Sequence, residues 1–387
     1  MKKKIVILGS TGSIGKTLFK ILKKDKKNFD IILLTTHRNY RELYKQAKIF
    51  NVKNLIVTDN KSFNFFKKKN LNKKIKIFNN YKCLPKILRK KVDYTMCSIS
   101  GLQGLEPTLR MIKYSKKVAV ANKEAIICGW SLIKKALKSN KTEFIPVDSE
   151  HFSIWSLLKN KENNNIDKVY ITASGGPFLN WSLKKIKNAS PTKALKHPNW
   201  SMGKKISIDS ATMMNKVFEV IETQRIFSLP KSKIYILIHQ NSYVHAIVQF
   251  KNGLRKFLAH DTNMSIPIFN TIYHGNNEFI KSKDLDIKNL NNLNFKFVDI
   301  KKFPFVKILD LIPEKSSLFE TMLVSANDEL VNFYLNKKIT YSKFQKTLQK
   351  FIKLKEFVKL KKKKPRNITE IYALNELVRL KIKKLCI

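Results

Sequence analysis

Two groups of acidic side chains have the spacing to hold a divalent metal ion. Asp148 and Glu150 follow a strand-like apolar run at 143–147 and lie two residues apart. Residues two apart in extended backbone project to the same side, and two facing carboxylates repel each other unless a cation neutralises them. An all-oxygen ligand set favours Mg²⁺ or Mn²⁺ over zinc. A helix cap formed by Asp148 or Ser149 is the alternative interpretation.

A third carboxylate is expected on a helix predicted over residues 211–227. There Asn215, Lys216 and Glu219 share one helical face, because they are three and four residues apart. Glu222 continues that face, and the spacing alone does not choose between Glu219 and Glu222 as a metal ligand. A simple Glu–Lys ion pair within the helix would explain the same residues.

Glycines are concentrated in one loop near the start of the chain. Only 11 glycines occur in 387 residues, and three of them lie in Gly9-Ser10-Thr11-Gly12-Ser13-Ile14-Gly15, between a strand-like run and a helix-like segment. Backbone N–H groups and the helix N-terminus can hold a dinucleotide pyrophosphate in this context. After the second predicted strand, where an NAD site carries an acidic residue, the chain has His37-Arg38-Asn39, so NADP is favoured. A ligand-free βα turn and a solvated Arg38 are the alternatives.

Two further segments suit a phosphorylated substrate. Ala173-Ser174-Gly175-Gly176-Pro177 follows a predicted strand and exposes backbone and hydroxyl donors to an oxyanion. Ser210, Asn215 and Lys216 add further donors and a positive charge. The segment from His197 to Gly203, HPNWSMG, places Trp200 among turn-forming residues, as in a mobile lid. Plain turn formation, and a tryptophan packed on the core, would explain these segments equally well.

These residues need a scaffold of strands and helices to position them. The strand-like runs of the first part are 5–8, 31–34, 54–57, 92–97, 117–121 and 143–147, and the helix-like segments are 14–23, 40–50, 105–113 and 123–138. Their alternation predicts a parallel α/β domain over 1–147. Residues 60–80, rich in Lys and Asn, are interpreted as a solvated loop with a weak strand.

The rest of the chain changes character twice. Residues 148–275 mix strand-like 169–172 and 234–239 with the helix at 211–227, which predicts an α+β catalytic domain with a lid loop. Residues 276–300 are interpreted as a surface linker. Residues 301–387 are predicted to form a C-terminal helical bundle, because helical spacing recurs at 317–335, 341–357 and 368–385.

The amino-acid composition limits which binding partners and which cellular compartment we expect. Lys and Arg number 77 against 28 Asp and Glu, a formal net charge of +49, which would attract anions such as nucleic acid. The lysines are spread through the whole chain without a nucleic-acid-binding module, so we interpret them as compositional drift and expect no nucleic-acid partner. Without a long apolar run or a signal peptide, the sequence predicts a cytoplasmic protein with no membrane partner. The four scattered cysteines are expected to be small buried hydrophobes.

The order and spacing of the segments resemble the 1-deoxy-D-xylulose 5-phosphate reductoisomerase family over effectively the whole chain. The likeness is carried by GSTGSIG, ANKE, VDSEH, TASGGPF, HPNWSMGKKISIDSATMMNKVFE and SANDEL. It implies a Rossmann-like NADPH-binding domain, an α+β catalytic domain and a C-terminal helical bundle. It also implies a homodimer that converts 1-deoxy-D-xylulose 5-phosphate to 2-C-methyl-D-erythritol 4-phosphate, using NADPH and Mn²⁺, Mg²⁺ or Co²⁺, in isoprenoid precursor synthesis. Another NADP-dependent sugar-phosphate reductase is the alternative, and it would not need three metal-binding carboxylates.

The resemblance assigns roles residue by residue. The metal ligands would be Asp148, Glu150 and Glu219, which favours Glu219 over Glu222, and Lys123 and His197 would join them as catalytic residues. The substrate contacts would be Lys123, Ser149, Glu150, Ser174, His197, Trp200, Ser210, Asn215, Lys216 and Glu219. The cofactor contacts would be Thr11, Gly12, Ser13, Ile14, Arg38, Asn39, Asn122, Glu124 and Gly203.

The chain departs from the family pattern at three places. His37 stands where many members have glycine, and the family's HPQS reads His239-Gln240-Asn241-Ser242. The usual DMR-x-P-I stretch reads Asn263-Met264-Ser265-Ile266-Pro267-Ile268, without the Asp and the Arg. These changes bear on local packing or catalytic efficiency and leave every implied metal and phosphate position intact.

Overall fold

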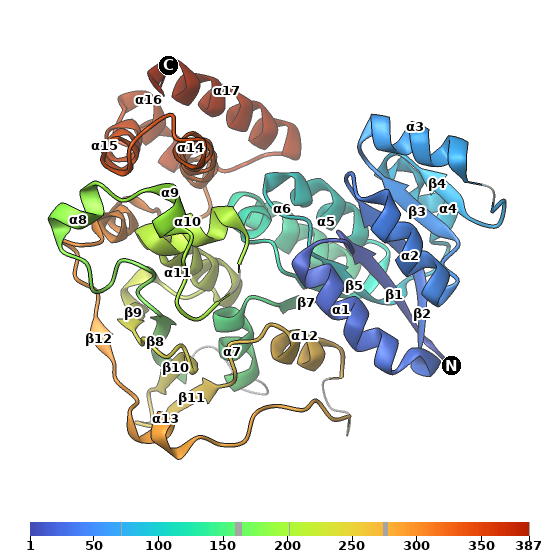
Figure 1. Cartoon of the computed structure of the whole chain (residues 1–387), viewed down its shortest axis with the longest axis horizontal. Coiled ribbons are helices and arrows are strands. Elements are labelled where there is room, and N and C mark those ends of the chain that lie inside the picture. Colours follow the sequence, from blue (N-terminus) through green and yellow to red (C-terminus); the bar gives the residue numbers. More distant parts are fainter. Residues whose placement is uncertain (71, 159–164, 201, 274–277, 387) are drawn as a thin grey trace. The chain divides into compact units, whose positions relative to one another are not determined.

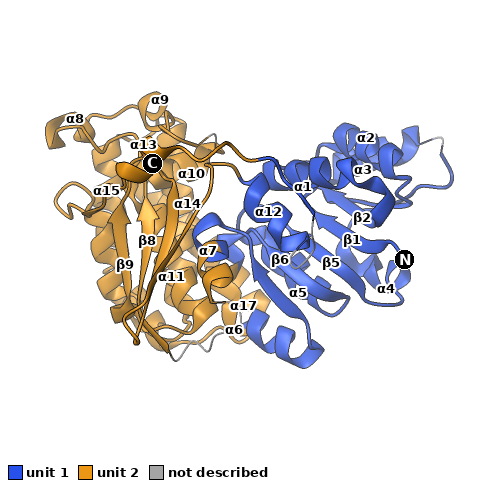
Figure 2. Ribbon diagram, turned by 90° about the horizontal axis from the view of Figure 1, so that it is seen from below, with its two compact units in different colours: residues 1–125, 132–152, 264–281 blue, residues 126–131, 153–263, 282–387 orange. Residues whose placement is uncertain are grey.

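The chain forms two compact units in the computed structural model (Figures 1 and 2). The structure describes residues 1–387 except 71, 159–164, 201, 274–277 and 387. Unit 1 comprises 1–125, 132–152 and 264–281, and unit 2 comprises 126–131, 153–263 and 282–387. The expected boundary at 275/276 lies outside the described residues.

The described part of unit 1 contains a seven-stranded parallel sheet in the order β4-β3-β2-β1-β5-β6-β7. The strands are β1 (Lys3–Leu8), β2 (Phe29–Thr36), β3 (Asn54–Val57), β4 (Lys76–Phe78), β5 (Val92–Cys97), β6 (Ser115–Val120) and β7 (Glu143–Pro146). Residues 5–8 of β1 are fully buried, as expected for a parallel strand covered on both faces. The chain order reverses between β1 and β5, which is the point where such sheets bind ligands.

Helices alternate with these strands along the chain and confirm the predicted parallel α/β pattern. They are α1 (Ser13–Lys24), α2 (Tyr40–Phe50), α3 (Asn60–Lys69), α4 (Leu84–Ile87), α5 (Leu105–Ile112) and α12 (Ser265–Ile272), together with the parts of α6 (Lys123–Asn140) and α7 (Ser149–Leu157) that fall in this unit. Helix α12 belongs to unit 1 although it lies far along the chain. The Thr271 hydroxyl is 2.8 Å from the hydroxyl of Tyr94 on β5, and Tyr273 donates to Asp25 at 3.0 Å.

The prediction that residues 60–80 form a loop with a weak strand was wrong for their first half. Residues 60–69 form α3, while the weak strand is β4. Asp59 caps this helix by accepting from the backbone N–H of Ser62 at 2.9 Å, and the side chain of Phe66 in the helix is buried. Phe66 is the one buried residue of α3, and a single buried position gives no clear periodic signal.

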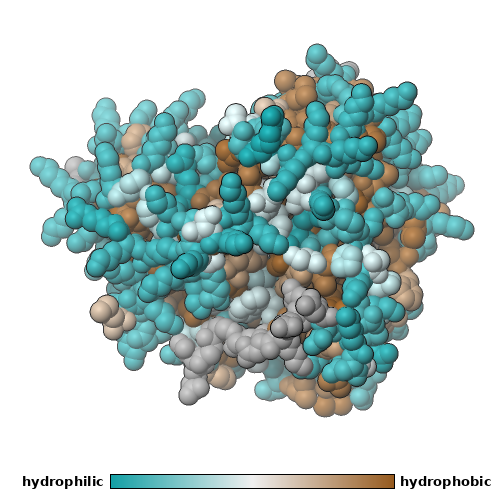
Figure 3. Space-filling model, turned by 180° about the vertical axis from the view of Figure 1, so that it is seen from behind, coloured by the Kyte–Doolittle hydropathy of each residue, from teal (hydrophilic) through white to brown (hydrophobic). Residues whose placement is uncertain are grey.

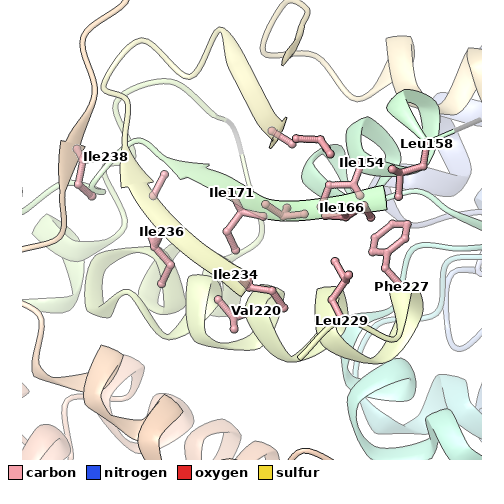
Figure 4. Packing of buried hydrophobic residues seen from close by; sticks show 14 of the residues in the cluster. Ile154, Leu158, Ile166, Ile171, Val220, Phe227, Leu229, Ile234, Ile236 and Ile238 are labelled. Atoms are coloured by element: carbon pink, nitrogen blue, oxygen red, sulfur yellow. The ribbon is translucent and has the colours of Figure 1, made fainter. Parts of the chain in front are cut away.

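Unit 2 contains, in its described residues, a five-stranded sheet in the order β11-β10-β8-β9-β12. The strands are β8 (Ile166–Ala173), β9 (Ile234–Ile238), β10 (Val244–Phe250), β11 (Arg255–Ala259) and β12 (Lys296–Phe297). Strands β8 and β9 are parallel, and the other pairs are antiparallel. One face packs on a helix through residues such as Ile171, Ile236 and Val220 (Figure 4). This agrees with the predicted α+β character.

The single helix predicted at 211–227 is in fact two helices. Helix α10 (Lys204–Thr212) ends at Met213, whose φ of 63° is left-handed, and α11 (Met214–Phe227) begins directly after it. The apolar pattern continues through Met213, so it gave no sign of the break. The break places Asn215 and Lys216 in the first turn of a new helix, where the helix dipole favours an anion.

The C-terminal segments are helical, as predicted, except that the segment predicted at 341–357 is divided into two helices before Lys355. The C-terminal helices are α14 (Leu318–Leu335), α15 (Tyr341–Phe351), α16 (Lys355–Val358) and α17 (Ile368–Cys386), and the shorter helices of unit 2 are α8 (Leu183–Lys187), α9 (Pro191–Ala194) and α13 (Ile287–Asn291). Helix α14 is buried along most of its length and starts with a capping box of Ser317 and Glu320. Hydrophilic side chains cover most of the face shown in Figure 3. Among the described helices, none combines the length and apolar character needed to cross a bilayer.

Candidate functional site

The glycine loop follows β1 at the point where the order of the unit 1 sheet reverses. A Cβ atom on Gly9 would lie 2.9 Å from the carbonyl oxygen of Ser98, and one on Gly15 would lie 2.4 Å from the carbonyl oxygen of Gly9. No side chain fits at either position. Gly12 is the N-cap of α1 and has no side chain with which to cap it. The first N–H groups of α1, at Ser13 and Ile14, are therefore suited to an anion.

The loop is held against β2 by hydrogen bonds. The N–H of Gly9 donates to the Thr35 hydroxyl at 2.9 Å, and the N–H of Ser10 donates to the Thr35 carbonyl at 2.9 Å. The hydroxyls of Thr11 and Thr36 lie 2.6 Å apart. These contacts within the protein fix the conformation of the loop. A pyrophosphate site needs such a preorganised loop. Sequence reasoning did not identify Thr35, because any polar residue at the end of a strand gives the same pattern.

An open pocket lies at the carboxyl ends of β2 and β3. Its lining residues are His37, Arg38, Thr58, Asp59, Asn60 and Lys61. Arg38 is 75% exposed and places its Nε 3.3 Å from a carboxylate oxygen of Asp59. Hydrogen bonds from Ser62 and the neighbouring Arg38 hold the pKa of Asp59 below its usual range. Asn39, also expected to contact the cofactor, caps α2 by accepting from the N–H of Glu42 at 3.2 Å.

The first two predicted metal ligands lie beyond the carboxyl end of β7. Asp148 accepts an ion-pair contact from Lys123 of α6, Nζ to Oδ2 3.0 Å, and the Lys123 side chain is only 9% exposed. The Ser149 hydroxyl donates to Glu150 at 2.7 Å. Asp148 immediately precedes α7, and its carboxylate accepts from the adjacent N–H of Ser149 at 3.1 Å. Asn122 and Glu124 are buried beside Lys123 at the start of α6.

The third carboxylate belongs to α11 in unit 2. Lys216 and Glu219 are both buried and form an ion pair, and Asn215 donates its amide to the other oxygen of Glu219. The Lys216 ammonium also donates to the carbonyl of Thr172 at the end of β8. The structure therefore brings together three residues that helical spacing predicted. Glu222 is equally buried one turn later, so burial does not choose between the two glutamates. The Thr172 carbonyl was missed, because a backbone acceptor has no sequence signature.

The Ser-Gly-Gly turn packs directly on the end of α10. Gly175 and Gly176 have φ values of 84° and 66°, which L side chains rarely adopt. A Cβ on Gly176 would lie 2.7 Å from the carbonyl oxygen of Ser210 and 3.3 Å from its hydroxyl. The glycines thus allow the turn and Ser210 to approach closely. The turn that begins with Ser174 therefore lies against Ser210, another of the four residues predicted to hold a phosphate.

His197 is fixed as a neutral hydrogen-bond relay between the predicted lid and this turn. Its Nδ1 accepts from the N–H groups of Asn199 and Trp200 at 3.2 and 3.0 Å, so the ring proton must be on Nε2. Nε2 lies 3.0 Å from the Ser174 hydroxyl and donates to it. Burial, with the positive charge of Lys216, lowers the pKa of His197 to about 4. The ring is therefore uncharged at neutral pH.

The relay leaves Ser174 as a directed donor. Its oxygen accepts from His197 and also from the N–H of Gly176 at 3.1 Å. With both acceptor positions occupied, the hydroxyl proton can only be donated outward. A phosphate oxygen is a suitable acceptor for it.

The predicted lid packs against the unit 2 sheet. Trp200 meets the ring of His245 edge to face, with centroids 6.0 Å apart, and His245 stacks on His260 at 3.8 Å. Asn199 donates its amide to the Ser242 hydroxyl at 2.9 Å. Ser201 lies outside the described residues, and Gly203 is the N-cap of α10. His245 was not identified from the sequence, where it is one more residue in a strand.

The predicted metal ligands are divided between the units. Asp148 and Glu150 belong to unit 1, and Glu219 belongs to unit 2. The same division holds for the other candidates: the glycine loop, Arg38 and Lys123 lie in unit 1, while Ser174, His197, Ser210 and Lys216 lie in unit 2.

Comparisons with known proteins give one consistent result. The family model of 1-deoxy-D-xylulose 5-phosphate reductoisomerase matches residues 5–129, and two models of its C-terminal domains match residues 144–227 and 260–381. The 1-deoxy-D-xylulose 5-phosphate reductoisomerase of Pelagibacter ubique is 59% identical over 100% of both chains. That of Wolbachia pipientis wMel is 37% identical over 90% of this chain and 89% of its own.

Solved structures give the same likeness in three dimensions. The reductoisomerase of Zymomonas mobilis in complex with NADPH has a TM-score of 0.89 and 28% identity, covering 100% of this chain and 99% of its own. A DOX-P reductoisomerase in complex with NADPH, fosmidomycin and magnesium also has a TM-score of 0.89, with 29% identity over 99% and 98% of the two chains.

Proposed function

The chain belongs to the 1-deoxy-D-xylulose 5-phosphate reductoisomerase family, and we infer from this membership that it converts 1-deoxy-D-xylulose 5-phosphate to 2-C-methyl-D-erythritol 4-phosphate with NADPH and a divalent metal. The observation that carries the conclusion is the full-length match to the Pelagibacter relative, since it spans every segment of the candidate site. NADPH supplies a hydride and the metal supplies a Lewis acid when they are bound. The protein residues bind, orient and polarise the substrate.

The glycine loop fits NADPH. Thr11, Gly12, Ser13 and Ile14 hold the pyrophosphate in this proposal, and Arg38 meets the 2′-phosphate. Two observations support it: the loop has no room for a Cβ at Gly9 or Gly15, and α1 begins without a side-chain cap. Arg38 is largely exposed, and Asp59 restrains it through Nε.

The acidic residues fit a hard divalent cation. We propose that Asp148, Glu150 and Glu219 hold Mg²⁺ or Mn²⁺, because an all-carboxylate donor set suits these ions. Within unit 1 Lys123 pairs with Asp148, and within unit 2 Lys216 pairs with Glu219. Each pairing places a cation beside a candidate ligand. The Lys123 ammonium would also add positive charge beside substrate oxygens as they gain negative charge.

The substrate phosphate is assigned to Ser174, Ser210, Asn215 and Lys216. The directed hydroxyl of Ser174 and the helix N-terminus at Asn215 and Lys216 support this assignment. His197 joins the phosphate to the lid, because the N–H groups of Asn199 and Trp200 hold the ring that orients Ser174. The phosphate group is not part of the bonds that react. Its binding energy would then stabilise the closed lid.

A spectrophotometric assay tests the function. Purified protein is mixed with 1-deoxy-D-xylulose 5-phosphate, NADPH and Mg²⁺ or Mn²⁺, with and without excess chelator, and the product is identified by mass spectrometry. We expect metal-dependent NADPH oxidation that yields methylerythritol phosphate. Turnover that persists undiminished in Glu219→Gln would contradict the metal assignment, and a folded protein that binds NADPH but never turns over would contradict the function.

We also propose that the protein is a homodimer whose copies meet through the sheet of unit 2. The sheet face opposite the buried core carries an apolar row across adjacent strands, Phe257, Ile247, Tyr170 and Tyr235, in direct register. Phe257 is 55% exposed, and the two tyrosine rings stack at 5.3 Å. Such a surface favours association. A dimer by light scattering that becomes monomeric in Ile247→Lys supports the proposal, and a wild-type monomer contradicts it.

The cytoplasm is the compartment we propose for this activity. All four cysteines lie in described segments, where they are free and buried, which suits a reducing compartment. Cell fractionation with the native protein checks this, and recovery from an oxidising compartment would contradict it.

A further inference from the structure

A buried polar network joins α10, in the middle of unit 2, to the C-terminal helix α14. Asp209 of α10 is completely buried. Its Oδ1 accepts from the amide of Asn327 at 2.8 Å, and its Oδ2 lies 2.9 Å from the ammonium of Lys205, one turn earlier on α10. The same ammonium lies 3.1 Å from Asp328 of α14.

The network has a specific geometry that a packed apolar contact would not impose. A buried carboxylate is costly unless charged and hydrogen-bonding partners surround it. Lys205 holds Asp209 from within α10, whereas Asn327 holds it from another helix. Sliding α10 along α14 would break the second contact and leave a buried acceptor unsatisfied. The network therefore defines one position of α10 along its axis.

The position of α10 matters because its C-terminal end reaches the candidate site. Ser210 directly follows Asp209, and its carbonyl oxygen lies where a Cβ on Gly176 would meet it at 2.7 Å. After the left-handed residue Met213, the chain starts α11 with Asn215 and Lys216. A shift of α10 would thus move Ser210 against the Ser-Gly-Gly turn and change the start of α11.

The residues of α14 that follow Asn327 form ion pairs with the last helix, α17. Arg379 of α17 lies 2.8 Å from Glu329 and 3.4 Å from Asp328, so α14 is itself held by charge. Arg379 also donates through Nε to Asn375 at 3.1 Å. The C-terminal helices are connected in this way to a phosphate-site helix without contributing a residue to the phosphate site.

We propose that Asn327 is a positioning residue for substrate binding: through Asp209 it fixes α10 so that Ser210 faces the Ser-Gly-Gly turn. The inference rests on the proposed function, because it takes Ser174 and Ser210 as the phosphate site. Asn327 touches neither substrate nor cofactor in this role. Its removal acts on the affinity for the sugar phosphate and leaves the glycine loop in unit 1 unchanged.

The test compares Asn327→Leu with a matched variant on the same helix. Leu has a similar volume but cannot donate to Asp209, and we expect KM for 1-deoxy-D-xylulose 5-phosphate to rise about tenfold while KM for NADPH stays constant. The control is Tyr334→Phe, which removes another buried hydrogen bond from α14, 2.9 Å to the carbonyl of Ala189, a residue outside α10. We expect both variants to lose similar thermal stability, but only Asn327→Leu to change KM. Equal KM values in the two variants would overturn the proposal.

An exchange variant keeps the proposal testable if Asn327→Leu does not fold. Asn327→Asp alone sets two carboxylates against each other and should also raise KM for the sugar phosphate. Adding Asp209→Asn restores an amide–carboxylate hydrogen bond and should bring KM back to within about threefold of wild type. No recovery in the folded double variant would count against positioning. If wild type itself shows no turnover, the function fails, and calorimetric binding of inorganic phosphate to the same variants then tests the positioning alone.

Discussion

The glycine loop of unit 1 and the phosphate-site residues of unit 2 are positioned in two different ways. The loop consists of consecutive residues, and its shape follows from the lack of space around Gly9 and Gly15 and from backbone hydrogen bonds to β2. Ser174, His197 and Ser210 come from separate segments and depend on side-chain hydrogen bonds and close packing. Adding a side-chain atom to a glycine of the loop should therefore weaken NADPH binding. Removing a hydrogen-bond donor should weaken binding at the phosphate site.

The largest expected effect is that of Gly15→Ala on the loop. The added Cβ would lie 2.4 Å from the Gly9 oxygen and 2.6 Å from the Ser10 Cα, both backbone atoms that cannot move independently. The loop must shift, and a displacement on the order of 1 Å can reduce function by about 100-fold. We expect at least that loss in NADPH affinity, measured by titration of NADPH fluorescence.

A glycine with free space around it provides the control. Gly253 in the β10–β11 turn has a φ of 83°, and no atom within 4 Å of an added Cβ. Gly253→Ala should cost about 1–2 kcal/mol of stability from the left-handed backbone and leave NADPH affinity unchanged. If the NADPH affinity of Gly15→Ala is within threefold of wild type, the lack of space around Gly15 does not determine the conformation of the loop.

Ser174→Ala is expected to have the next largest effect, in unit 2. It removes the hydroxyl that His197 and Gly176 direct outward, so KM for the sugar phosphate should rise by about 10- to 50-fold, with NADPH affinity unchanged. Steady-state kinetics with each substrate varied in turn measure both values. Ser182→Ala is the matched change, since Ser182 only caps α8 by accepting from the N–H of Lys185 at 3.4 Å. A parallel loss of NADPH affinity in Ser174→Ala would contradict the separation between the two regions.

The same difference explains what the sequence could and could not predict. Strands β3 and β5 were predicted to the residue, and the glycine loop was found with them, because local pattern determines each of these features. The left-handed break at Met213 was missed, since its neighbours are apolar on both sides of it. The contact from Asn327 to Asp209 joins residues 118 positions apart, and no local spacing encodes such a partner. Buried acceptors such as the Thr172 carbonyl are likewise visible only after folding.

The pH dependence of the unfolding free energy tests the role of His197 in unit 2. Burial, followed by the charge of Lys216, lowers its pKa from 6.5 to about 4. A base whose pKa is lower in the folded state contributes stability above pH 6.5, and this contribution is lost as the pH falls from 6.5 towards 4. Urea unfolding at a series of pH values should show a steeper loss in this window for wild type than for His197→Gln. Equal slopes would show that His197 is not the titrating group.

The smallest expected effect concerns Lys61, and it separates a local contact from the general positive field. Lys61 lines the pocket beside Arg38, whereas Lys67 lies in the last turn of the same helix α3 and is not among the lining residues. Each substitution by Ala lowers the net charge equally, so a diffuse attraction predicts equal effects on NADPH binding. We expect KM for NADPH to rise about threefold in Lys61→Ala alone, with no change for NADH, because an exposed charge contributes little and acts only over a short range. Equal increases in both variants would assign the effect to the field of the whole chain, and the pocket at the ends of β2 and β3 would then add no selectivity beyond that of Arg38.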